Sequence, residues 1–145
     1  MSEIDQSDLK IIKALENDGR ASFMDLAKKL KMNESTIRKR VLALQRKGII
    51  RRFTIELDPA KIGLKTIATV GMDVEPTALL NTVQKLCEIP EIRSVATSTG
   101  DHMIMTEIWT SDGRSLTEIL VKKVGTIEGI RRLCPAIILE NFKKT

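Results

Sequence analysis

Apolar residues in the first part of the chain recur at the spacing of an amphipathic helix. Leu9, Ile12 and Leu15 share one helical face, and they follow Asp5, a typical N-cap residue. This pattern predicts a first helix over residues 5–17, with Leu9, Ile12 and Leu15 directed toward a core.

Two further helices are predicted close behind the first. Ser22, with Asp25 three positions later, has the pattern of a capping box and predicts a helix of about nine residues. A three-residue turn then ends at Asn33, which is suited to cap a longer helix that runs to about Lys47. A short helix, a tight turn and a longer helix form the pattern of a helix-turn-helix.

The third predicted helix has one apolar and one polar face. Ile37, Val41 and Leu44 fall on a single narrow face and must point inward. The opposite face carries Ser35, Thr36, Arg38, Lys39 and Arg46.

The position of each polar residue along this helix suggests its role. Arg38 lies in the first two turns, the part of a recognition helix that reaches base edges, and arginine can bridge O6 and N7 of guanine. Lys39 and Arg46 are better placed for phosphate contacts. Arg40 lies at the edge of the buried face, so a role in helix packing and a role at DNA both remain open.

Period-2 patterns begin after the third helix. Residues 49–57 form a β-rich run that ends at Asp58 and Pro59, and Gly63 closes the following turn. We expect this run to form a wing, with Arg51 and Arg52 beside the DNA backbone.

The rest of the chain alternates strand and helix patterns. Strands are predicted at 65–74, 92–98, 103–110 and 130–141, and helices at 76–89 and 114–124. The order βαββαβ predicts a ferredoxin-like sheet of four antiparallel strands with both helices on one face. Consecutive apolar residues such as those at 136–139 suggest that the other sheet face is covered as well, most simply by a second copy in a two-fold dimer.

Charge divides the chain in the same way. Residues 28–52 hold ten basic residues and one acidic residue, a net charge of +9, whereas residues 53–145 have a net charge of −1. Positive charge concentrated on one small domain is the electrostatic footprint of a protein that binds a phosphate backbone, although a charge run of this kind can also be a solvated helix face. We therefore expect a winged helix-turn-helix domain at 1–52, a strand and hinge at 53–64, and an oligomerisation domain at 65–145, in the α+β class.

Composition argues against several other functions. Cys87 and Cys134 lie 47 positions apart and His102 is the single histidine, so we expect no metal site and no cofactor. No run is apolar enough to span a membrane, and the N-terminus lacks the pattern of a signal peptide, which favours a cytoplasmic protein. Four aromatic residues in total offer little for stacking single-stranded bases.

The chain resembles the Lrp/AsnC family of transcription regulators over nearly its whole length. The resemblance is carried by residues 5–19, by Asn33 to Val41 with Leu44 and residues 48–50, and by residues 57–63. It implies a winged helix-turn-helix joined to a ligand-binding αβ sandwich, so that residues 65–145 are expected to form an effector-binding and oligomerisation domain. It also implies dimers that assemble into octamers or similar rings, with amino-acid effectors bound between dimers.

Both sets of candidate site residues follow from this reading. The DNA-binding residues expected are Ser22, Lys31, Asn33, Ser35, Thr36, Arg38, Lys39, Arg40, Arg46, Arg51 and Arg52. The effector-binding residues implied by the resemblance are Thr99, Gly100, Asp101, His102, Met103, Thr126, Ile127, Glu128 and Gly129.

Gly100 and Asp101 allow two interpretations. Asp101 could accept hydrogen bonds from the ammonium group of an amino acid, while backbone groups around Gly100 serve its carboxylate. Alternatively, the two residues only form a tight turn between antiparallel strands. Most family members carry an acidic residue at the position of Met103, and the last strand has Arg131 and Arg132 where hydroxyl residues are frequent.

These features bear on three possible functions. The patterns favour a sequence-specific transcription regulator that is not an enzyme. The +9 segment alone would also permit an architectural DNA-binding protein. A sirohaem decarboxylase-like enzyme shares the architecture, but one histidine and no tyrosine supply little for general acid-base chemistry.

Overall fold

The computed structural model describes residues 4–144, so residues 1–3 and 145 lie outside the described part of the chain. The chain divides after Leu57 into two compact units. The division falls within the 53–64 stretch that the sequence marks as a hinge. Each unit has a hydrophobic core of its own.

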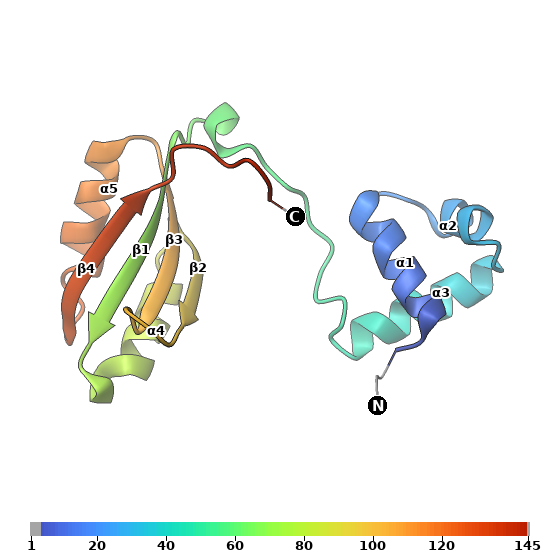
Figure 1. Cartoon of the computed structure of the whole chain (residues 1–145), viewed down its shortest axis with the longest axis horizontal. Coiled ribbons are helices and arrows are strands. Elements are labelled where there is room, and N and C mark those ends of the chain that lie inside the picture. Colours follow the sequence, from blue (N-terminus) through green and yellow to red (C-terminus); the bar gives the residue numbers. More distant parts are fainter. Residues whose placement is uncertain (1–3, 145) are drawn as a thin grey trace. The chain divides into compact units, whose positions relative to one another are not determined.

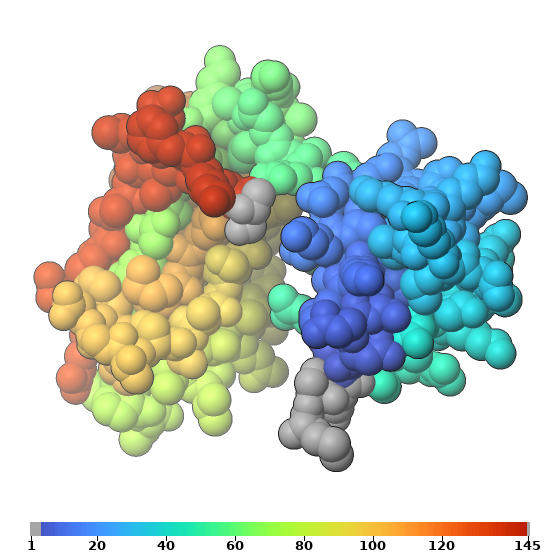
Figure 2. All heavy atoms as spheres, turned by 45° about the vertical axis from the view of Figure 1, so that its right-hand side comes forward, coloured from blue at the N-terminus to red at the C-terminus, as the bar shows by residue number. Residues whose placement is uncertain are grey.

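The first unit consists of three helices: α1 (Gln6–Asn17), α2 (Phe23–Leu30) and α3 (Glu34–Arg46) (Figure 1). Their N-caps are the predicted ones. The capping box of Ser22 and Asp25 is complete, with the Asp25 amide 3.0 Å from the Ser22 hydroxyl and the Ser22 amide 3.1 Å from the Asp25 carboxylate. The three helices pack together in one body, coloured blue to cyan in Figure 2.

The buried face of α1 differs from the predicted one. Ile11 and Ala14 enter the core together with Leu26, Ile37 and Val41. Leu15 packs against the edge of this cluster, and Leu9 is 45% exposed. The helix is therefore turned about its axis relative to the expected orientation. The apolar spacing alone could not show this, because the buried face also includes Asp8, whose charge is paired with Arg40.

The predicted wing is not formed. Residues 51–58 have no regular secondary structure, and Phe53 and Ile55 are 50% and 73% exposed. The amides of Ile49 and Ile50 both donate to the Leu44 carbonyl and close the end of α3. A β-rich run becomes a strand only beside another strand, and the described chain forms no ladder with this segment.

The second unit is an antiparallel sheet with the strand order β2-β3-β1-β4. Its strands are β1 (Thr66–Val74), β2 (Ile92–Thr97), β3 (Ile104–Thr110) and β4 (Ile130–Ile137). The connections are α4 (Leu79–Cys87), entered through the 3₁₀ turn η2 (Pro76–Ala78), and α5 (Gly113–Ile119), continued by the π-helical turn η3 (Leu120–Val124). A further 3₁₀ turn, η1 (Pro59–Ile62), precedes β1. The predicted βαββαβ order and its ferredoxin-like topology are therefore confirmed.

Strand β4 is shorter than the predicted 130–141. It pairs with β1 up to Ile137, and the last contact is the Ile138 amide donating to the Ile67 carbonyl at 2.8 Å. Because β1 begins at Thr66, the chain beyond has no strand to pair with.

Both helices cover one face of the sheet. Alternate residues of β1, such as Val70 and Met72, share a core with Leu86 of α4 and Leu116 of α5. The opposite face carries the intervening residues, which include Asp73 and Glu107, and its exposure varies along the strands. Among the described residues, no helix covers this second sheet face, and its burial in a two-fold dimer stays a prediction.

Candidate DNA-binding surface and effector site

The exposed face of α3 is polar and positively charged. Ile37, Val41 and Leu44 are buried, which turns the residues between them outward. Ser35, Arg38, Lys39 and Arg46 are exposed and Thr36 is half-buried. The predicted division of this helix into a core face and an outward face is confirmed.

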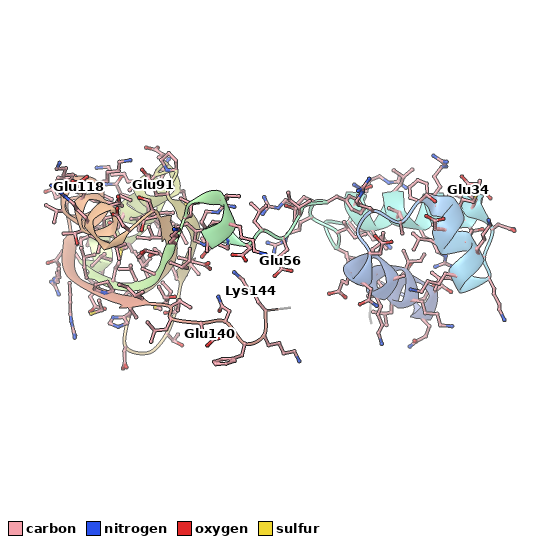
Figure 3. All side chains as sticks on the ribbon, turned by 90° about the horizontal axis from the view of Figure 1, so that it is seen from above. Glu34, Glu56, Glu91, Glu118, Glu140 and Lys144 are labelled. Atoms are coloured by element: carbon pink, nitrogen blue, oxygen red, sulfur yellow. The ribbon has the colours of Figure 1, made fainter. Side chains whose placement is uncertain are left out.

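Arg38 is held by two neighbours. Its guanidinium carbon lies 4.9 Å from the centroid of the Phe23 ring, and one of its nitrogens lies 3.4 Å from a carboxylate oxygen of Glu34. Glu34 stands one turn before Arg38 on α3 and is labelled in Figure 3. Phe23 is the first residue of α2, so this contact joins the two helices of the helix-turn-helix.

Arg40 is bound to acidic residues of α1. One guanidinium nitrogen donates to the two carboxylate oxygens of Asp5 at 2.9 and 2.7 Å and to Asp8 at 3.1 Å. These hydrogen bonds from Arg40, together with one from the Asp8 amide, hold the pKa of Asp5 below its usual value. The same contacts raise the pKa of Arg40. Its charge is neutralised within the fold.

The turn residues of the motif have local roles in the backbone. Ser22 is occupied by the capping box of α2. Lys31 adopts a left-handed conformation with φ 54°, which ends α2 and starts the turn. Asn33 is the N-cap of α3 but makes no side-chain capping hydrogen bond. All three are exposed, as are Arg51 and Arg52 in the segment after α3.

The loop between β2 and β3 holds five of the effector candidates. The Ser98 hydroxyl donates to the His102 carbonyl at 2.7 Å, and the Ser98 amide donates to the Met103 carbonyl at 3.0 Å. Gly100 has φ 106°, a conformation that favours glycine. Thr99, Gly100 and Asp101 are exposed at the tip. The loop is thus closed at its base, with its tip open to solvent.

His102 lies on the open face of the sheet against Gly71. A Cβ atom at Gly71 would come within 2.3 Å of the imidazole ring, so only glycine leaves room for it. The Nδ1 atom of His102 lies 3.6 Å from the Asp73 carboxylate. Sequence analysis missed Gly71 and Asp73. The available signal was a glycine inside a β-branched run, which indicates close approach by another group.

The turn after η3 holds the other four candidates. Thr126 donates its hydroxyl hydrogen bond back to η3, at 3.2 Å from the carbonyls of Lys122 and Lys123. Ile127 is buried in the core, and Glu128 is exposed. Gly129 has φ 98° and accepts a hydrogen bond from the Glu75 amide at 2.8 Å.

The two candidate segments lie at the same end of the sheet, on either side of β1. The Met103 amide donates to the Met72 carbonyl at 3.1 Å, and Gly129 is bonded to Glu75, so the segments flank the last residues of β1. The buried side chain of Ile127 serves the core. Asp101, Thr126 and Glu128 remain at the surface.

Neither a metal-binding cluster nor a membrane-spanning helix occurs among residues 4–144. This part of the chain brings together no group of three or more His, Cys, Asp or Glu side chains able to hold a metal ion. Within it, no helix has the length and apolar character needed to cross a membrane.

The two units match two family models. Residues 4–45 match the AsnC-type helix-turn-helix domain, and residues 67–145 match the Lrp/AsnC ligand binding domain. The two matched ranges correspond to the helical unit and to the sheet unit.

Several known proteins are similar to this chain over nearly their whole length. The HTH-type transcriptional regulator LrpA of Pyrococcus horikoshii is 44% identical over 97% of this chain and 99% of its own. LrpA1 of Halobacterium salinarum is 31% identical over 92% of this chain and 94% of its own. The structure of E. coli AsnC superposes with a TM-score of 0.90 and 25% identity, over 99% of this chain and 97% of that one.

Proposed function

This chain belongs to the Lrp/AsnC family, and on that premise we propose that it is a sequence-specific DNA-binding transcription regulator modulated by a small molecule. The observation that carries the proposal is the basic outer face of α3 within a complete helix-turn-helix. The relatives described above are themselves transcription regulators, and we assign this chain no catalytic role. A transcription regulator acts where the DNA is, which favours the cytoplasm.

The exposed residues of α3 divide into two roles at DNA. Ser35, Thr36 and Arg38 lie in its first two turns and are assigned to base edges. Lys39 and Arg46 are assigned to phosphates, as are Arg51 and Arg52 beyond the helix. The exposed turn residues Lys31 and Asn33 reach the backbone in the same way.

Arg40 and Ser22 act on DNA indirectly in this proposal. Arg40 is paired by Asp5 and Asp8, so it holds α3 against α1. Ser22 accepts a hydrogen bond within its own capping box, which sets the start of α2. Of the two roles that the sequence left open for Arg40, the contacts support the packing role.

The effector is proposed to be an amino acid bound at the end of the sheet where the β2–β3 loop and the 126–129 turn flank β1. Asp101 would accept hydrogen bonds from the ammonium group, and backbone amides near Gly100 would donate to the carboxylate. Support comes from the match to a ligand-binding domain and from the exposed loop tip. Because one chain leaves this edge open, the site is proposed to be completed by a second dimer.

Assembly is proposed to begin with a two-fold dimer. In the described part of the chain, no helix covers the sheet face opposite α4 and α5, and two such faces can bury one another. Dimers would then join into an octamer or a similar ring, which brings the proposed effector sites of neighbouring dimers together.

The direct test is selection of DNA sites in vitro by the full chain, with and without each of the twenty amino acids. We expect an enriched sequence whose affinity changes when one amino acid is added. If each dimer meets roughly 6 to 10 phosphates, affinity falls about 10³- to 10⁵-fold between 50 and 200 mM salt. Equal affinity for selected and random DNA would instead identify an architectural protein.

Two substitutions separate base contacts from phosphate contacts. Arg38→Ala should weaken binding to the selected site by about 1 to 3 kcal/mol and relax preference at one base pair. Arg46→Ala should weaken all sequences alike and reduce the salt slope by about 1. Fluorescence anisotropy on a set of single-base variants measures both, and equal losses on every duplex for both variants would contradict the division.

A further inference from the structure

The aromatic ring of Phe23 lies against the guanidinium group of Arg38. The guanidinium carbon of Arg38 lies 4.9 Å from the centroid of the Phe23 ring, within the range of a cation–π interaction. The Arg38 side chain is 55% exposed, so this contact does not bury it. The ring supports a charged group that still faces solvent.

The Phe23 ring is a fixed support. Phe23 directly follows the N-cap Ser22, and the two hydrogen bonds of the capping box set the backbone there. The ring also packs against the core cluster that contains Leu26 and Ile37. The ring beneath Arg38 is therefore held by the capping box and by packing against the core of the helical unit.

Stacking and base recognition use different parts of a guanidinium group. A cation–π contact uses the flat face, whereas the hydrogen bonds to guanine O6 and N7 leave from the edge. Both can exist at once. Glu34 contacts a single nitrogen of Arg38 at 3.4 Å, and an arginine has five N–H donors. Donors therefore remain free for a base.

Restraint of Arg38 has a consequence for specificity. A free arginine side chain loses rotamer entropy when it binds a base, and a side chain already held in place loses less. The gain applies only where the edge finds a matching base, because phosphate contacts tolerate many side-chain positions. Phe23 should thus affect discrimination more than overall affinity.

We propose that Phe23 is a specificity-determining positioning residue, whose ring holds the Arg38 guanidinium with its edge toward one base pair. This inference rests on the proposed function, since it assumes that α3 reads DNA. It adds a residue of α2, outside the exposed face of the recognition helix, to the determinants of sequence preference.

The test uses the full chain, its selected operator, a set of operators with one base pair changed, and a random duplex. The variants are Phe23→Leu and Phe23→Met, which keep an apolar side chain without a ring, and Phe23→Tyr, which keeps the ring. Each is also combined with Arg38→Ala. Thermal unfolding of every variant shows whether the helical unit remains folded.

We expect Phe23→Leu and Phe23→Met to lower discrimination by about 2- to 5-fold at the base pair that Arg38→Ala relaxes. Affinity for random DNA and the salt slope should stay the same, and Phe23→Tyr should behave as the wild type. When Arg38→Ala is already present, replacing the Phe23 ring should cause no further loss of discrimination.

Four results would overturn the inference: unchanged discrimination in folded Phe23→Leu and Phe23→Met, equal losses on all duplexes, failure of Phe23→Tyr to retain discrimination, or an undiminished ring effect in the Arg38→Ala background. A wild-type chain that binds operator and random DNA equally would overturn the proposed function as well. Intact wild-type selectivity with any of the four results would overturn the role of Phe23 alone.

Discussion

At the scale of single residues, the fold decides which charges are available to a partner. Arg40 and Arg38 are two positions apart on α3 and look equivalent in the charge count. The structure pairs Arg40 with the two carboxylates of Asp5 and Asp8. Arg38 contacts Glu34 through one nitrogen and stays 55% exposed on an aromatic ring. Net charge therefore overstates the number of cations that face DNA.

Arg40→Ala should lower the midpoint of thermal unfolding of the helical unit, because Asp8 is largely buried and loses its partner. DNA affinity should fall without a change in salt slope, whereas loss of a phosphate contact reduces that slope by about 1. Lys39→Ala is the matched control on the same helix. It should leave the midpoint of thermal unfolding unchanged and reduce the salt slope. A reduced slope for Arg40→Ala would place Arg40 at the DNA backbone.

The Asp5–Arg40 contact also predicts a pH dependence. Arg40 lowers the pKa of Asp5 in the folded state, so the contact stabilises the fold fully above the unfolded-state pKa of about 3.9. That stabilisation is lost as the pH falls through the lower folded-state pKa. Urea unfolding of wild type and Arg40→Ala between pH 6 and pH 2 should therefore show the two stabilities converging in acid. A difference that stays constant would contradict an ionic role.

Thr82 offers a test of polar burial. Its side chain is completely buried in α4, and no described residue forms a hydrogen bond with its hydroxyl. Because an unpaired buried hydroxyl is unfavourable, Thr82→Val should stabilise the sheet unit by about 1 kcal/mol. Chemical denaturation measures the change. Destabilisation of similar size would mean that the hydroxyl has a partner in solution.

At the scale of elements, short-range patterns predict helices better than strands. The capping box of α2 involves residues three positions apart, so its hydrogen bonds can be predicted from the local sequence. The segment 49–57 has an equally strong β pattern but forms no strand, because a strand depends on a second segment beside it. The same dependence ends β4 at Ile137.

The β2–β3 loop is positioned by an element distant in sequence. His102 rests on Gly71 of β1, and Gly71→Ala would place a Cβ atom 2.3 Å from the ring. The ring must then leave Asp73, and the loop should shift with it. If the effector binds there, the change in DNA affinity caused by the amino acid, typically about 5- to 150-fold, should shrink toward none.

Binding without effector should be unaffected by Gly71→Ala. Gly113→Ala is the matched control, since a Cβ at Gly113 meets nothing within 4 Å. Calorimetry and anisotropy together measure effector binding and its coupling to DNA. An undiminished response in Gly71→Ala would place the effector elsewhere.

At the scale of the whole molecule, charge and folding unit coincide. The positive excess lies in the unit that ends at Leu57, and residues 53–145 have a net charge of −1. A fragment of residues 53–145 should therefore associate into dimers through its open sheet face without binding DNA. Sedimentation measures the association of the fragment, and fluorescence anisotropy measures its binding to DNA. A stable monomer would contradict the proposed interface, and DNA binding by the fragment would contradict the assignment of charge.

The sequence by itself determined the helix-turn-helix, the βαββαβ order and the outward face of α3. These depend on periodicity and capping, which act over a few residues. The family resemblance added the expectation of an effector site at one end of the sheet. Only the tertiary structure decided that Asp5 and Asp8 occupy Arg40, that Phe23 supports Arg38, and that His102 lies on Gly71. Each of these contacts joins side chains from separate elements, and such meetings depend on how the elements pack rather than on any local pattern.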